Sequence, residues 1–247
     1  MEKLSAYIVS SGNIIFAGNT HTMSLNANGT KEQALREQLV AAVQKLDRLG
    51  MNRGSTGNAS VRLSYGTREG MLITPTGMDS DDLRVQDLVW LGFDGTLRGD
   101  WQPSSEWHFH RAIYLARTDL NAIVHTHSVN ATALACLDRG LPAFHYMVAI
   151  AGGADVPCVG YHTFGSEALS QAVAEALRDR QACLMAHHGL VAASESMARA
   201  MKIAVEIESL CETYLKALAM NEPALLNAAQ MAEVIDKFKT YGKSKPS

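Results

Sequence analysis

Residues 122–137 read AIVHTHSVNATALACL, an apolar run that ends in two histidines and leads directly into a second apolar stretch. The run from Ala122 to His127 contains β-branched residues and is short, which predicts a largely buried strand. The stretch from Val129 to Leu137 predicts a helix, because its apolar residues recur at helical spacing. A strand followed at once by a helix is typical of a mixed α/β protein.

The same reading extends to both sides of this stretch. Leu35, Leu39 and Val43 recur at four-residue steps and predict a helix that begins after Thr30 and stops at Gly50. Short strand candidates precede it at 6–9 and 14–17, the segment 26–30 is expected to be a loop, and 140–165 is expected to be mostly irregular. Further strands are expected over 59–64, 70–74, 86–91 and 182–186, and further helices over 104–117, 166–179, 195–220 and 224–241.

Helices interleaved with short strands, with hairpins early in the chain, predict one α/β domain. Its central sheet is expected to be largely antiparallel and flanked by helices. Residues 1–30 are expected to form an N-terminal extension of unknown role, and residues 31–247 the main domain. The long predicted helix 195–220 carries apolar residues on most of its faces, which predicts burial on more than one side.

Composition excludes several classes of protein. The chain has 247 residues, 47% of them hydrophobic and 19% charged, with a formal net charge of −3. These values are ordinary for a globular protein and argue against a nucleic-acid binder with a broad basic surface. We expect no membrane partner, because no run approaches the roughly 20 apolar residues that span a bilayer. Four unpaired cysteines and no signal peptide predict a cytoplasmic protein.

The histidines indicate a metal site. His125 and His127 lie two residues apart on a predicted strand, so both imidazoles point to the same face and can hold one ion. A third ligand is expected from His188 or its neighbour His187, which follow another apolar strand. Three neutral imidazoles are typical of catalytic zinc. His110 shares a helix face with Glu106. We interpret it as a packing residue or as a residue that contacts the site residues without binding the metal itself.

Three segments predict an anion site. Residues 103–106 (PSSE) open a helix, where exposed amides and two hydroxyls favour an anion, with Glu106 beside them as a candidate base. Residues 54–58 (GSTGN) and 74–77 (TPTG) offer further amides and hydroxyls. Each alone is more often an ordinary turn, but three beside a candidate metal site indicate phosphate.

Together these segments resemble the class II aldolase/adducin family. The resemblance rests on residues 57–62 (GNASVR), 72–77 (LITPTG), 103–107 (PSSEW), 124–127 (VHTH) and 187–189 (HHG). Residues 145–147 (HYM), 151–153 (AGG), 161–165 (YHTFG) and 237–242 (KFKTYG) are most similar to family members that cleave L-fuculose 1-phosphate.

The resemblance implies a three-layer αβα catalytic domain over 31–247. It further implies a zinc-dependent homotetramer with active sites between subunits and one zinc per subunit. The implied ligands are His125, His127 and His188, with Glu106 as the base and as a fourth ligand when substrate is absent. Tyr146 and Tyr241 are the implied further catalytic residues, and Phe164 and Phe238 the implied apolar walls. The implied phosphate contacts are Gly57, Asn58, Thr76, Gly77, Ser104 and Ser105.

The implied activity is a lyase of carbohydrate metabolism, a reversible aldolase. Its expected substrate is L-fuculose 1-phosphate or a related deoxy- or methylthio-pentulose 1-phosphate, cleaved to dihydroxyacetone phosphate and an aldehyde. A methylthioribulose-1-phosphate dehydratase and a pentulose-phosphate epimerase are the rivals within the superfamily, although epimerases are expected to carry Asp at the position of Glu106. An adducin-like module without catalysis is a further alternative, but it would be expected to lack the metal histidines. A metallohydrolase is less favoured, because no HExxH motif occurs.

Overall fold

A computed structural model describes residues 20–240, and its centre is an eight-stranded sheet in the order β4-β3-β2-β1-β5-β8-β7-β6. All neighbouring strands are antiparallel except β6 and β7. This confirms the predicted α/β domain with a largely antiparallel sheet. The strands are β1 (Asn58–Arg62), β2 (Gly70–Ile73), β3 (Val89–Gly92), β4 (Leu97–Arg98), β5 (Ala122–Thr126), β6 (Cys158–Val159), β7 (Ala182–Met185) and β8 (Gly189–Ser194).

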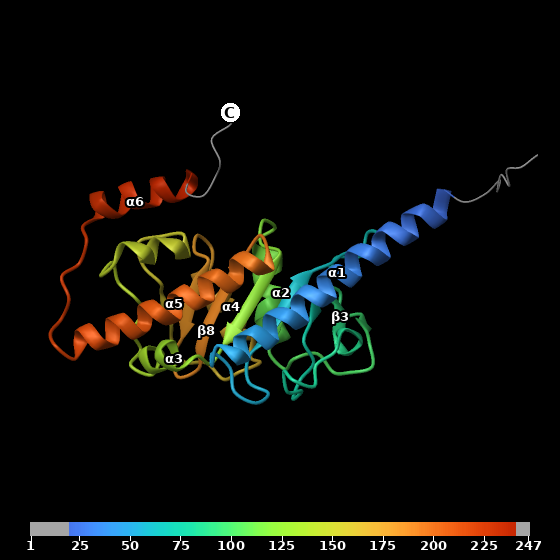
Figure 1. Ribbon diagram of the computed structural model, residues 1–247, viewed down its shortest axis with the longest axis horizontal. Coiled ribbons are helices and arrows are strands. Elements are labelled where there is room, and N and C mark those ends of the chain that lie inside the picture. The colour runs from blue at the N-terminus through green and yellow to red at the C-terminus, as the bar shows by residue number, and fades with distance from the viewer. Residues whose placement is uncertain (1–19, 241–247) are drawn as a thin grey trace, which may run out of the picture.

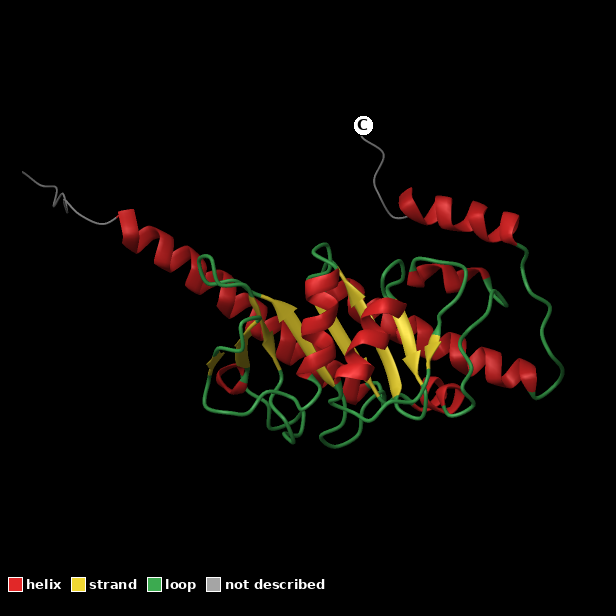
Figure 2. Ribbon diagram, turned by 180° about the vertical axis from the view of Figure 1, so that it is seen from behind, coloured by secondary structure: helices red, strands yellow, loops and turns green. Residues whose placement is uncertain are grey.

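Helices cover both faces of the sheet (Figure 2). Helices α2 and α4 pack together on one face, while α1, α3 and α5 pack on the other. Within residues 20–240, no helix combines the length and the apolar character needed to cross a membrane. The helices are α1 (Thr20–Arg48), α2 (Trp107–Ala116), α3 (Val129–Ala135), α4 (Glu167–Ala176), α5 (Met197–Leu218) and α6 (Ala228–Thr240), with short 3-10 turns η1 (Val85–Asp87) and η2 (Tyr146–Ala151).

Strand β5 shows why the sheet needs two helical layers. Its Ile123 packs into the core under α2 and α4, whereas Ala122 and Val124 pack into the core under α1, α3 and α5. Successive side chains of a strand point to opposite faces. A strand that is apolar at consecutive positions is therefore buried on both faces. The continuous apolar run in the sequence is thus accounted for by the three layers.

Helix α1 corrects the expected loop at 26–30. The helix runs unbroken from Thr20 to Arg48, so Thr30 lies inside it and is not its cap. Extending a helix from an established turn costs far less free energy than nucleating a new one. A growing helix can therefore include residues of poor helix propensity such as Gly29. The N-terminal half of α1 projects beyond the sheet (Figure 1). The expected stop is confirmed, because Gly50 follows the helix with a φ of 69°. The strand candidates at 6–9 and 14–17 lie outside the described residues.

Strand β8 has no counterpart in the sequence prediction. Its residues, GLVAAS, include two alanines and a serine, which favour strands only weakly. The strand is nevertheless fully buried, and it pairs with both β5 and β7. Hydrogen bonds from its two neighbours therefore impose the extended conformation. The segment 140–165, expected to be irregular, also contains η2 and β6.

The register of the strands brings distant residues to one end of the sheet. Asn58, at the start of β1, lies opposite His125 near the end of β5. Thr126 lies opposite Leu190 at the start of β8, so the turn between β7 and β8 adjoins the end of β5. The predicted ligands therefore meet at this end of the sheet.

Candidate active site and metal centre

Three imidazoles and one carboxylate converge at this end of the sheet. One ligand atom from each of Glu106, His125, His127 and His188 lies within 4.8 Å of every other. Nε2 of His125 lies 2.9 Å from Nε2 of His127 and 3.1 Å from Oε2 of Glu106. Nε2 of His188 lies 3.0 Å from Oε1 of Glu106. The structure thus brings together the four residues that the resemblance implied.

The backbone aims these side chains inward. His125 and His127 alternate at the end of β5, as the strand periodicity predicted. The turn between β7 and β8 places His188 beside them by means of His187, which adopts a left-handed φ of 55°. A Cβ at the next residue, Gly189, would lie 2.3 Å from the Thr126 carbonyl oxygen. Glycine therefore allows this turn to approach β5 closely.

Hydrogen bonding shows that the cluster suits a cation. Nδ1 of His125 lies 3.0 Å from the carbonyl oxygen of Leu190, so it donates there, and the lone pair of the neutral ring is on Nε2. That lone pair faces the Nε2 of His127 and the carboxylate of Glu106. Oε1 of Glu106 is buried and has no hydrogen-bond partner in the described chain. Lone pairs and a carboxylate directed at one point form the donor set of a metal ion.

The charges of the cluster follow from its burial. Burial alone would raise the pKa of Glu106, but the adjacent imidazoles of His125 and His188 outweigh burial and hold that pKa well below its usual value. Glu106 is therefore a carboxylate. Burial, together with the neighbouring His125 and His188, lowers the pKa of His127 to about 4. A neutral imidazole and an ionised carboxylate are the forms that bind a metal.

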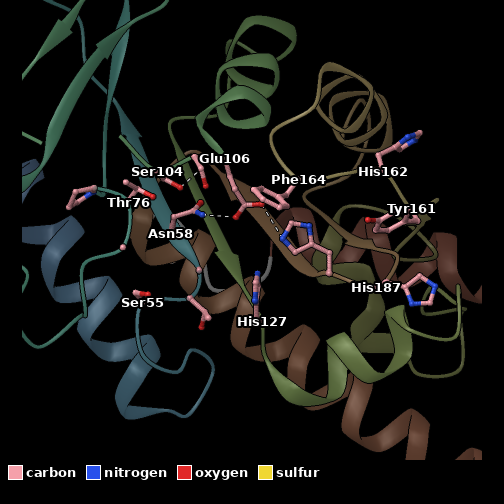
Figure 3. A pocket seen from close by; sticks show the side chains of 16 residues that line it. Ser55, Asn58, Thr76, Ser104, Glu106, His127, Tyr161, His162, Phe164 and His187 are labelled. Carbon is pink, nitrogen blue, oxygen red and sulfur yellow. Dashed lines mark hydrogen bonds and ion pairs between the residues drawn. The ribbon is translucent and has the colours of Figure 1, made fainter. Parts of the chain in front are cut away.

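A cavity of about 360 Å³ opens beside this cluster (Figure 3). Among the residues that line it in the described chain there is no lysine or arginine, and one wall consists of neutral donors. These donors include all six predicted phosphate contacts, Gly57, Asn58, Thr76, Gly77, Ser104 and Ser105, together with Ser55 and Thr56. Hydroxyls and amides at this density fit a phosphate, as three separate segments of the sequence had indicated.

Backbone hydrogen bonds hold two of these segments side by side. The amide of Thr76 donates to the Gln102 carbonyl, and the amide of Ser104 donates to the Thr74 carbonyl. The expected start of the following helix is corrected, because α2 begins at Trp107 and Glu106 occupies its N-cap position. Ser104 and Ser105 therefore precede the helix, where the positive end of its dipole faces the cavity wall.

Gly57 fits its position for two reasons. Its φ is 74°, in the left-handed region, and a Cβ there would lie 2.5 Å from the side chain of Asn52. The Oδ1 of Asn52 in turn accepts a hydrogen bond of 3.3 Å from the His127 amide. The loop that carries Gly57 is thus linked directly to the segment that carries His127.

Of the remaining predicted residues in the described part of the chain, one lines the cavity and the others do not. Tyr146 begins η2, is 50% exposed and does not line this cavity. Phe164 lines the cavity, whereas Phe238 packs against the core in α6. Tyr241 lies outside the described residues.

Sequence reasoning missed part of the cavity wall. Tyr161, His162 and His187 line the cavity beside Phe164 (Figure 3). Tyr161 is 62% exposed, and its ring centroid lies 6.0 Å from that of His187. Tyr161 and His162 lie in a segment without a periodic pattern, and their only sequence signal was the resemblance of 161–165 to family members. His187, the alternative to His188 as a ligand, lies outside the cluster and lines the cavity instead.

Comparisons with known proteins agree with this geometry. The family model described as "Class II Aldolase and Adducin N-terminal domain" matches residues 37–215. A 5-methylthioribulose-1-phosphate/5-deoxyribulose-1-phosphate aldolase of Rhodospirillum rubrum is 47% identical over 209 residues, which cover 85% of this chain and 93% of that protein. An L-fuculose phosphate aldolase of Escherichia coli is 44% identical, covering 84% of this chain and 95% of that protein. A solved L-fuculose 1-phosphate aldolase superposes with a TM-score of 0.79 at 36% identity, covering 83% of this chain and 96% of that one.

Proposed function

The chain belongs to the class II aldolase and adducin family, and on that premise we propose that it reversibly cleaves a ketose 1-phosphate. The products are dihydroxyacetone phosphate and an aldehyde. The proposed substrates are L-fuculose 1-phosphate and the deoxy- or methylthio-pentulose 1-phosphates, on which the similar proteins named above act. One observation carries this proposal: a carboxylate and three imidazoles adjoin a wall of neutral anion-binding groups within one cavity.

We propose zinc, one ion per subunit, held by His125, His127 and His188. Nitrogen ligands with one carboxylate oxygen nearby favour zinc over magnesium or calcium, which prefer oxygen ligands. When bound, the ion supplies a Lewis acid that stabilises negative charge developing on the substrate. The hydrogen bond from His125 to the Leu190 carbonyl holds this ring in the tautomer that ligation requires.

Phosphate binding is assigned to the neutral wall of the cavity. Ser104 and Ser105 offer hydroxyls, and Gly57 and Gly77 offer backbone amides without side chains that would exclude the ligand. The N-terminus of α2 adds a positive dipole at the same wall. Binding the phosphate here would bring the carbon chain of the sugar toward Glu106.

Glu106 is the proposed acid and base at C3 of the ketose. In the direction of addition, its carboxylate takes a proton from the hydroxymethyl carbon of dihydroxyacetone phosphate. In cleavage, the proton of the C4 hydroxyl passes to the proposed tyrosine partner Tyr146, the C3–C4 bond breaks, and Glu106 returns a proton to C3. Its burial and its contacts with the rings of His125 and His188 keep the carboxylate near the reacting carbon.

Tyr146 and Tyr241 are the proposed partners of the C4 oxygen. Tyr146 is half-exposed and does not line the cavity of its own subunit. This supports the proposal that it contributes to the active site of a neighbouring subunit in a homotetramer. Mixing inactive Tyr146→Phe and Glu106→Gln proteins should then regenerate active sites in mixed tetramers. Mixtures that exchange subunits but gain no activity would refute the shared site.

Two broader assignments complete the proposal. Residues 31–247 are the proposed catalytic domain and 1–30 an extension, although α1 runs unbroken across this boundary. We propose a cytoplasmic location, which the four free cysteines support.

The decisive experiment compares substrates by kcat/KM. L-fuculose, L-rhamnulose, D-ribulose, 5-deoxyribulose and methylthioribulose 1-phosphates are each tested for release of dihydroxyacetone phosphate. Glu106→Gln should keep the fold and lose about a hundredfold to ten-thousandfold in kcat, the usual contribution of a positioned acid or base. Release of no dihydroxyacetone phosphate from any of these substrates would contradict the aldolase, and formation of a dehydrated or epimerised product would identify a rival activity.

A further inference from the structure

Helix α2 and strand β1 are joined by a chain of hydrogen bonds within the fold. Five side chains form it, and none is more than 7% exposed: Glu106, Asn58, His110, Ser60 and Tyr114. The chain runs from Oε2 of Glu106 to the Asn58 amide nitrogen at 2.9 Å, and from the Asn58 oxygen to Nε2 of His110 at 2.6 Å. It continues from Nδ1 of His110 to the Ser60 hydroxyl at 2.7 Å.

The spacing of side chains on helix α2 matches the spacing of side chains on strand β1 along this series of hydrogen bonds. Glu106, His110 and Tyr114 lie four residues apart along α2, a separation of about 6 Å. Asn58 and Ser60 lie two residues apart on β1, a separation of about 6.6 Å, and point to the same face. Each side chain of the strand therefore fits between two side chains of the helix.

The Glu106 carboxylate, at one end of this series, fixes which group donates and which accepts in each hydrogen bond. A carboxylate only accepts, so Asn58 must present its NH₂ group to Glu106, and its carbonyl oxygen must then accept from Nε2 of His110. The Nδ1 of a neutral ring accepts from the Ser60 hydroxyl. Burial lowers the pKa of His110 to about 3 and keeps this ring neutral. The phenol of Tyr114 donates to the Ser60 carbonyl at 3.1 Å.

We propose that His110 is a positioning residue for the acid–base step, because it fixes the orientation of the Asn58 amide that holds Glu106. This proposal rests on the proposed aldolase function and deepens it. The amide of Asn58 is symmetric in shape, so nothing but its hydrogen bonds distinguishes the NH₂ group from the oxygen. Without a donor at the position of Nε2, the amide is free to turn its oxygen toward the Glu106 carboxylate, and the two would repel each other.

Two substitutions of His110 separate the proposed role from packing. His110→Gln keeps an NH₂ group near the position of Nε2 and can still donate to Asn58. His110→Asn reaches only the position of Nδ1, so it loses that donor while it still faces Ser60. His108→Asn is the matched control on the same helix, since in the described chain the Nδ1 of His108 has no hydrogen-bond partner.

The measurement is exchange of hydrogen for deuterium on the hydroxymethyl carbon of dihydroxyacetone phosphate in D₂O, by the zinc-loaded protein without aldehyde. This partial reaction reports the proton transfer of Glu106 alone. His110→Asn should slow exchange and kcat together by about tenfold to a hundredfold, the scale of a misplaced catalytic group. His110→Gln should stay within about threefold of the wild type at equal thermal stability.

Two results would overturn the proposal: exchange by His110→Asn at the wild-type rate per folded site, or equal losses in the Gln and Asn variants. Ser60→Ala provides a second test if His110→Asn does not fold. It removes the donor to Nδ1 and should slow exchange by about threefold to tenfold, whereas an unchanged rate would refute the role of the chain. A wild-type protein that neither exchanges nor releases dihydroxyacetone phosphate would instead refute the aldolase itself.

Discussion

Acid should destabilise the wild-type protein more than His110→Gln, because the buried imidazole cannot take up a proton. The pKa of His110 is lowered from 6.5 to about 3 in the folded protein, chiefly by burial and further by the neighbouring His125. A histidine of the unfolded chain gains its proton as the pH falls below 6.5. The unfolded state therefore binds more protons between these two values, and the contribution of His110 to stability is lost as the pH falls through this window.

The size of the effect follows from proton linkage. At about pH 5.5 the unfolded imidazole is about tenfold more often protonated than neutral, while the folded one stays neutral. Unfolding is then favoured by RT times the logarithm of about eleven, or about 1.4 kcal/mol, whereas at about pH 7.5 the contribution is about 0.1 kcal/mol. Glutamine does not titrate, so this difference is absent from the variant.

The assay is urea unfolding of both proteins at the two pH values, at equal protein concentration and metal loading. The wild type should lose about 1.3 kcal/mol more than His110→Gln on acidification. Contributions from other groups, including His127 with its pKa lowered to about 4, occur in both proteins and cancel in the comparison. Parallel losses in the two proteins would show that His110 takes up a proton in the folded state, contrary to the direction assigned to its hydrogen bonds.

Two further predictions concern the ligands of the site. Metal analysis of the purified protein should find about one zinc per chain, and removal by a chelator should abolish turnover until zinc is restored; full activity of a metal-free protein would contradict the site. Replacing Ser104 and Ser105 together by Ala should raise KM for a ketose 1-phosphate by about a hundredfold or more, since two lost hydrogen bonds to a charged group weaken binding by about 3 kcal/mol or more in total. The same protein should turn over an unphosphorylated ketose as poorly as the wild type does, and equal use of both ketoses by the wild type would contradict the phosphate wall.

The pairing of His125 with His127 could be predicted from sequence because its signal is local, whereas the choice of His188 and of Glu106 as their partners came from the family resemblance. His125 and His127 share a strand face through a two-residue period, and the period holds wherever the strand packs. The choice between His187 and His188 was not settled by spacing. It depends on a left-handed φ at His187, a conformation that non-glycine residues rarely adopt and that spacing does not reveal.

The parts that could not be predicted depend on neighbours far along the chain. Strand β8 is extended because β5 and β7 lie on both sides of it, although its own residues favour strands weakly. The continuation of α1 through Gly29 likewise reflects the cost of starting a helix anew rather than local propensity. His110 was recognised only as a packing or supporting residue, because its partners Asn58 and Ser60 are about fifty residues away.

The position of Asn58 explains why a neutral side chain lies between the Glu106 carboxylate and the proposed phosphate site. Asn58 lines the proposed phosphate wall and donates to Glu106, so a bound phosphate would place its side chain between two acceptors that both carry negative charge. A lysine there would form an ion pair with Glu106 and compete with the metal for the carboxylate, while an aspartate would repel both neighbours. An amide offers two N–H donors without adding charge. This solution works only if the amide is kept in one orientation, and the buried chain through His110 provides that constraint.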